Sequence, residues 1–113
     1  MNTKPEIAYS QQRSQSWTRV DMLLSLYRSG ISSLDAAIEA KKLKDDAQSS
    51  LHRLKAIRVI YGIAAGLDMN HGSVPEQIAR LCEFSQFALQ TDSLESMESV
   101  RTILSTLSSA FEG

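Results

Sequence analysis

The sequence of 113 residues has little of several residue types on which folds and active sites often depend. Cysteine occurs once, at Cys82, so no disulfide can form within the chain. We expect Cys82 to act as a small core residue in a reducing compartment. Only two prolines and five glycines interrupt the chain, which leaves long stretches free to form regular structure.

Histidine is also scarce, and this limits the chemistry that the chain can perform. His52 and His71 are the only two histidines, and neither stands in a His-x-x-x-His or Glu-x-x-His pair, so a di-metal helical bundle is excluded. The sequence has no glycine-rich phosphate loop, and it offers no recognisable Ser-His-Asp set. We therefore predict that the protein is not an enzyme and that it holds no cofactor and no metal.

Long hydrophobic runs are missing as well. The longest candidate is interrupted by Arg58, Gly62 and Gly66, and it falls short of the ~18–20 residues of a membrane span. The first six residues, 1–6, lack the apolar core of a secretion signal. These features predict a cytoplasmic protein that does not act at a membrane.

The charge is small in total but uneven along the chain. Residues 1–58 hold ten basic and six acidic side chains, a net charge of +4, whereas residues 59–113 hold two and seven, a net charge of −5. Solvated helix faces, pairing between two halves of a bundle, or steering of a charged partner would each explain this asymmetry. Asp45 and Asp46 interrupt the basic residues between 41 and 58, and the pI near 6.1 is low, so we predict no nucleic-acid binding.

The hydrophobic pattern predicts four helices. After a polar, Gln/Ser-rich arm over residues 1–17, Thr18 and Asp21 form a capping-box pattern, and a stripe of period 3.6 continues to about Lys44. Gly30 inside this helix suggests a close helix crossing. The second helix begins at Asp45 or Asp46 and runs to about residue 68.

The remaining two helices follow a turn at residues 70–72. Ser73 is the predicted cap of the third helix, with proline and glutamate in its first turn. Asp92 is the predicted cap of the fourth, which carries a bundle seam over residues 97–111. Short connections between amphipathic helices predict an all-α, antiparallel four-helix bundle over residues 18–112, in a single domain of residues 1–113 with a short N-terminal arm.

The second helix has more apolar residues than one buried stripe requires. The residues that we expect to face inward are Leu51, Leu54, Ile57, Ile60, Tyr61, Ala64 and Leu67. Either this helix is central, or part of its surface is available to a partner.

Three segments resemble the FliS family of flagellar secretion chaperones. Residues 18–31, TRVDMLLSLYRSGI, are similar to the family's helix start, leucine-rich turn and Leu-Tyr-Asp motif. Residues 67–72, LDMNHG, are similar to its Leu-Asp-x-x-x-Gly turn, and residues 78–89 to its Ile-Ala-x-x-Leu motif and aromatic third helix. The chain departs from the family at Arg19, Arg28 and Ser85, where proline, an acidic residue and tyrosine are usual.

The resemblance implies a cytoplasmic chaperone that binds the disordered C-terminal segment of flagellin. Such a chaperone prevents premature polymerisation and assists secretion through the flagellar export apparatus, which is a second implied partner. The client would lie along the bundle as a helix in a groove, folding as it binds. We expect a monomer or weak homodimer. The candidate partner-binding residues are Ile7, Tyr9, Leu26, Tyr27, Ile60, Tyr61, Ile63 and Phe87.

An alternative function remains open at the level of sequence. The chain could be a helical adaptor, or an oligomeric interaction module unrelated to flagellin, with residues 97–111 feeding an intermolecular bundle.

Overall fold

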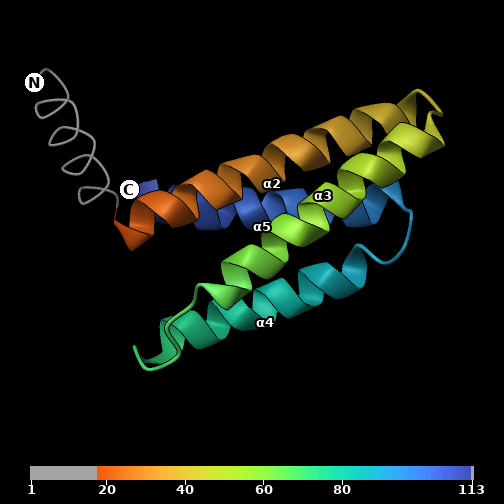
Figure 1. Ribbon diagram of the computed structural model, residues 1–113. Coiled ribbons are helices and arrows are strands. Elements are labelled where there is room, and N and C mark those ends of the chain that lie inside the picture. The colour runs from red at the N-terminus through yellow and green to blue at the C-terminus, as the bar shows by residue number, and fades with distance from the viewer. Residues whose placement is uncertain (1–17, 113) are drawn as a thin grey trace, which may run out of the picture.

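The computed structural model describes residues 18–112, which form four helices. These are α2 (Arg19–Lys42), α3 (Asp46–Ala65), α4 (Ser73–Ala88) and α5 (Leu94–Glu112) (Figure 1). No strand occurs among these residues, so the predicted all-α four-helix bundle is confirmed. None of the helices within residues 18–112 is long and apolar enough to cross a membrane.

Helix α2 is the element against which the bundle is assembled. It packs extensively on α3 and on α5, whereas α4 packs mainly on α3 and touches α5 much less. Figure 1 shows α3 crossing in front of α5, with α4 along the opposite side of α3 from α2. Helix α3 therefore joins α4 to the rest of the molecule.

The first two helix starts agree with the sequence prediction. Thr18 Oγ1 accepts from the Asp21 amide at 3.1 Å, and Asp21 Oδ2 accepts from the Thr18 amide at 3.0 Å, which completes the capping box. Asp45 caps α3 by accepting from the Gln48 amide at 3.2 Å. Each cap satisfies amide groups that a helix end leaves without a partner.

The other two predicted caps were wrong. Gly72, with φ of 87°, occupies the N-cap position of α4, so Ser73 is already helical and makes no capping bond. At α5, Ser93 Oγ accepts from the Ser96 amide at 3.0 Å. Asp92 instead accepts a hydrogen bond from Lys41 Nζ at 3.0 Å, which ties the α4–α5 turn to the end of α2.

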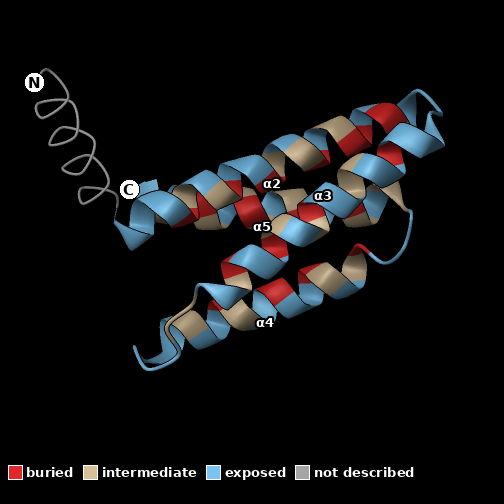
Figure 2. Ribbon diagram, in the orientation of Figure 1, coloured by how far each residue is buried: buried red, intermediate tan, exposed pale blue. Residues whose placement is uncertain are grey.

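The core runs along the inner faces of all four helices, where buried positions recur at helical spacing (Figure 2). Its members of lowest exposure include Tyr27, Leu34, Ile60, Ile63, Leu89, Met97, Val100 and Leu104. Cys82 belongs to this cluster, and burial raises the pKa of its thiol to about 11. The expectation of a core role for Cys82 is confirmed.

The face that α3 buries differs from the predicted one. Its buried positions are Ser49, Ala56, Ile60 and Ile63, while Leu51, Leu54 and Tyr61 are exposed. Ser49 can be buried because its hydroxyl donates to the Ala37 carbonyl at 3.0 Å. Helix α3 is therefore oriented so that several of its apolar side chains face solvent.

Candidate protein-binding surface

An apolar furrow lies between the first half of α2 and the last turns of α3. We call it the α2–α3 furrow. It is a cavity of about 410 Å³ lined by Arg19, Met22, Leu23, Leu26, Gly62 and Gly66. Met22 is exposed, Leu23 belongs to the core and Leu26 packs against the core. The furrow therefore exposes the edge of the hydrophobic core to solvent.

Two glycines at the end of α3, Gly62 in its last turn and Gly66 at its C-cap, line the furrow. Gly62 and Gly66 are four residues apart and lie on the same side of the helix. A Cβ added at Gly62 would meet Leu26 Cδ2 at 3.9 Å, an ordinary contact distance. Packing does not require glycine at residue 62, so this residue leaves open a space that a side chain could occupy.

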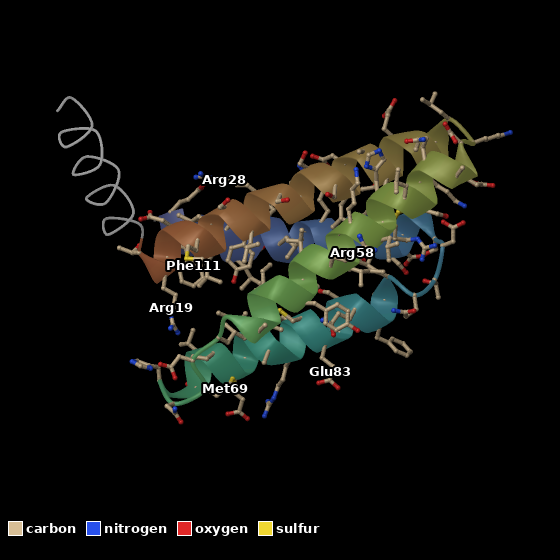
Figure 3. The ribbon with its side chains drawn as sticks, in the orientation of Figure 1. Arg19, Arg28, Arg58, Met69, Glu83 and Phe111 are labelled. Carbon is tan, nitrogen blue, oxygen red and sulfur yellow. The ribbon has the colours of Figure 1, made fainter. Side chains whose placement is uncertain are left out.

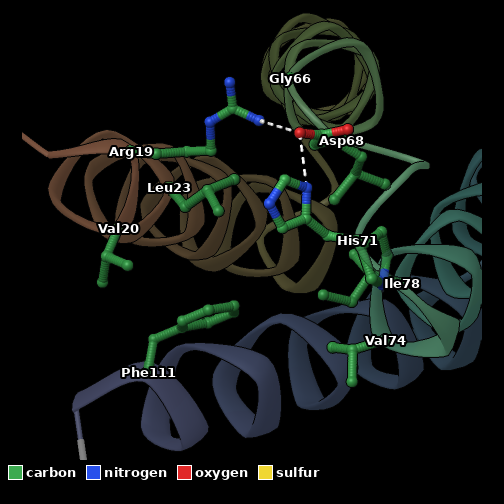
Figure 4. Close-up of a pocket in the computed structure, with 11 residues that line it drawn as sticks. Arg19, Val20, Leu23, Gly66, Asp68, His71, Val74, Ile78 and Phe111 are labelled. Carbon is green, nitrogen blue, oxygen red and sulfur yellow. Dashed lines mark ion pairs between the residues drawn. The ribbon is translucent and has the colours of Figure 1, made fainter.

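A second cavity, the end cavity, continues from the furrow at the end of the bundle (Figure 4). It shares Arg19, Leu23 and Gly66 with the furrow and also has a volume of about 410 Å³. Its other lining residues come from α2, the α3–α4 connection, α4 and α5: Val20, Leu67, Asp68, His71, Val74, Pro75, Ile78 and Phe111. Together, the two cavities expose residues from all four helices.

Charged groups line one side of the end cavity. Asp68 Oδ2 lies 2.6 Å from His71 Nδ1 and 4.0 Å from an Arg19 guanidinium nitrogen (Figure 4). The amide of Asn70 donates to Asp68 Oδ1, and this bond together with His71 and Arg19 lowers the pKa of Asp68. Asp68 therefore places negative charge on the wall of the end cavity, beside Arg19 at the start of α2.

Exposed aromatic and aliphatic side chains continue over α3 and α4. Tyr61 on α3 is 57% exposed, and Phe87 on α4 is 78% exposed. Leu51, Leu54, Leu81 and Phe84 are exposed on the same two helices. Exposed apolar side chains of this size are typical of sites that bind another protein where they adjoin one another.

The candidate residues from the sequence divide into three groups. Leu26 lines the α2–α3 furrow, and Tyr61 and Phe87 are exposed, so these three are accessible to a partner. Tyr27, Ile60 and Ile63 are fully buried. Ile7 and Tyr9 lie outside the described residues.

Because Tyr27, Ile60 and Ile63 are buried in the core, a partner at the surface cannot contact them. The Tyr27 ring stacks on Phe111, with ring centroids 5.8 Å apart. Burial, with a smaller contribution from Cys82, raises the pKa of Tyr27 to about 12. Ile60 and Ile63 belong to the same core cluster, so all three stabilise the bundle and present no surface in this conformation.

Sequence reasoning missed other residues of this surface. Met22, Gly62 and Gly66 line the furrow, and Phe84 is exposed beside Phe87. The one available signal was the pair of glycines at i and i+4 within a helical pattern, since glycine there lowers helix stability without an evident packing reason.

The chain matches a known protein family. A family model described as "Flagellar protein FliS" matches residues 1–113, the whole chain. No curated protein and no solved structure matches the chain.

Proposed function

Because the chain belongs to the FliS family, a family of flagellar export chaperones, we propose that its client is the disordered C-terminal segment of flagellin. In this proposal the chaperone covers the segment in the cytoplasm, prevents premature polymerisation and assists its secretion. The observation that carries the proposal is the apolar surface left open along the α2–α3 furrow and over α3 and α4.

The physical requirements of such a client match this surface. A disordered segment loses conformational entropy when it folds on binding, typically ~2–5 kcal/mol or more of the gross interaction energy. A large apolar contact can offset that cost, because burial of apolar area is the main favourable term in association. The furrow and end cavity supply recesses for anchoring side chains, and the exposed residues of α3 and α4 extend the contact beyond them.

The proposed contact residues are Leu26, Tyr61 and Phe87, together with Ile7 and Tyr9 of the N-terminal arm. Leu26 stands in the furrow, and Tyr61 and Phe87 are exposed on α3 and α4. Ile7 and Tyr9 precede Arg19, which lines both cavities, in the sequence, and we propose that this Ile/Tyr pair lies over a bound client. Aromatic anchors commonly dominate such interfaces.

Isothermal titration calorimetry with a peptide of the flagellin C-terminus tests the proposal. We expect binding with a strongly negative heat-capacity change, because apolar surface becomes buried. Tyr61→Glu and Phe87→Glu should each weaken binding by about tenfold or more, since a charge would face the client's apolar stripe. The matched control is Leu43→Glu, at a 70% exposed leucine in the α2–α3 turn.

Circular dichroism should show that all three variants remain folded, because the three residues are exposed. Absence of binding by the well-folded wild-type chain would overturn the proposal. Equal affinity of Tyr61→Glu, Phe87→Glu and Leu43→Glu for the peptide would instead show that Tyr61 and Phe87 do not contact the client.

The same proposal covers the oligomeric state and the second partner. We expect a monomer or weak homodimer that presents its loaded client to the export apparatus. The alternative function, an obligate oligomeric interaction module, predicts a larger species at every concentration. Sedimentation velocity over a range of concentrations separates the two.

A further inference from the structure

The outward side of α3 combines apolar and basic residues in one stripe. We define the outer α3 face by Leu51, Leu54, Lys55, Arg58 and Tyr61, all exposed. Residues 51, 54, 58 and 61 follow a 3-4-3 spacing, which places them in a line along the helix. Figure 3 shows Arg58 on the side of α3 nearest the viewer, opposite α5. The stripe is about 15 Å long, the length of three helical turns.

Lys55 and Arg58 differ from most arginines on the surface because they make no ion pair within residues 18–112. Arg28, Arg80 and Arg101 each make an ion pair, with Glu112, Glu76 and Asp35 respectively. Within residues 18–112, neither Lys55 nor Arg58 has an acidic partner. Helix α3 itself has no acidic residue after Asp46. The outer α3 face therefore carries positive charge that the described part of the chain does not neutralise.

We propose that the outer α3 face docks an amphipathic helix of the client whose apolar stripe is flanked by acidic residues. Leu51, Leu54 and Tyr61 contact the apolar stripe, and Lys55 and Arg58 pair with the acidic flank. A helix fits because the face repeats with helical period, so its residues meet a straight partner ridge at each turn. The inference rests on the proposed function, since it takes the bound client segment to be helical.

Charge also decides against symmetric pairing of two copies of this chain through the outer α3 face. Two copies joined through the same face would bring Lys55 and Arg58 of each opposite their counterparts. Like charges held together in an interface are unfavourable, and they suppress that pairing. The complementary partner is one that supplies negative charge beside apolar side chains.

Two designed peptides test this inference. Both are amphipathic helices of about 18 residues with the same leucine stripe, flanked in one by glutamate and in the other by lysine. With the full-length wild-type chain at about 0.05 M salt, we expect the glutamate-flanked peptide to bind at least about tenfold more tightly than the lysine-flanked one. At about 0.5 M salt the difference should shrink, because exposed charges are screened.

Reversal of the charge on α3 should reverse the preference. In Lys55→Glu/Arg58→Glu, the lysine-flanked peptide should bind more tightly. The matched control, Lys42→Glu/Lys44→Glu, makes the same change in net charge at the α2–α3 turn and should keep the wild-type preference. Unchanged preference in the α3 variant, equal binding of the two peptides, or no binding of either would overturn the inference.

The flagellin C-terminal peptide is titrated in parallel to separate the two proposals. If it binds while the designed peptides show no charge preference, only the inference fails. If the designed peptides show the expected reversal while the flagellin peptide does not bind, the proposed client is wrong and the outer α3 face remains a helix-docking site.

Discussion

Gly30 and Gly62 both lie inside helices, yet their surroundings are opposite. A Cβ added at Gly30 would lie 2.8 Å from Leu104 Cδ1 and 3.4 Å from Val59 Cγ1, so the backbone of α2 approaches its neighbours closely there. At Gly62 the same atom would lie at contact distance from Leu26. Residue 30 is glycine because the core is close, whereas residue 62 leaves the α2–α3 furrow open.

Alanine substitutions should separate these two roles. Gly62→Ala should raise the free energy of unfolding by up to about 1 kcal/mol, because alanine is the better helix former. It should also weaken binding of the flagellin peptide, because the new methyl group narrows the furrow. Gly30→Ala should lower the free energy of unfolding by about 1–2 kcal/mol, because buried Leu104 must move in a well-packed core. Urea unfolding and calorimetry measure both effects, and a gain in stability for Gly30→Ala would contradict the close crossing.

The sequence predicted the role of Gly30 but not that of Gly62. A glycine in a predicted helix suggests a close crossing, which the structure confirms at Gly30. The same residue type can also leave an empty space, and only the positions of neighbouring helices distinguish the two. Tyr27 and Ile60 were ambiguous for a related reason: periodicity places an apolar residue on a face without saying whether another helix covers it.

At the scale of elements, the ends of the helices depend on local geometry that residue type only partly determines. Thr18 was predicted correctly, and Asp45 is one of the two caps predicted for α3, because each directly precedes its helix and accepts from the amide three residues on. At α5 both Asp92 and Ser93 are good capping residues. The structure selects Ser93, since Asp92 is engaged by Lys41 from α2.

The two residues at the start of α5 should respond differently to substitution. Ser93→Ala should cost about 1 kcal/mol of stability at any salt concentration, because the Ser96 amide loses its capping partner. Asp92→Ala, which removes both the charge and any capping oxygen, should have a smaller effect that fades as salt is added, because it removes an exposed ion pair with Lys41. Urea unfolding at low and high salt checks this prediction, and a larger, salt-independent loss for Asp92→Ala would show that Asp92 is the cap.

Helix α3 shows why the buried face could not be obtained from the pattern alone. Its apolar residues surround more than half of the helix, so several faces fit a buried stripe equally well. The structure buries Ser49 by satisfying its hydroxyl with the Ala37 carbonyl, and Arg53 donates to the Leu89 carbonyl at 2.7 Å. Polar residues that find partners in the core are not visible in a hydrophobic pattern.

For the whole molecule, the four helices are unequally attached. Helix α2 packs closely on both α3 and α5, whereas α4 is held mainly by α3. On the inner side of α4, the Ser85 hydroxyl is buried and has no hydrogen-bond partner among residues 18–112, which weakens that interface. The antiparallel arrangement of the helices was predictable from their short connections, but the weaker attachment of α4 was not.

Native-state hydrogen exchange should therefore show α4 opening before the rest of the bundle. We expect amides in the middle of α4 to exchange with a lower free energy of opening than those in the middle of α2. Bound client that contacts Phe87 should slow exchange in α4 in particular. Equal protection of α2 and α4 in the free protein would contradict the unequal attachment.

The position of the single thiol has a practical consequence for following that motion. Cys82 is buried on the inner side of α4, and its thiol stays protonated at neutral pH because burial raises its pKa to about 11. A thiol reagent added to the unaltered chain can modify the chain only where α4 has swung away from its neighbours. The rate of alkylation, measured by mass spectrometry, therefore reports how often α4 detaches, and no engineered label is needed.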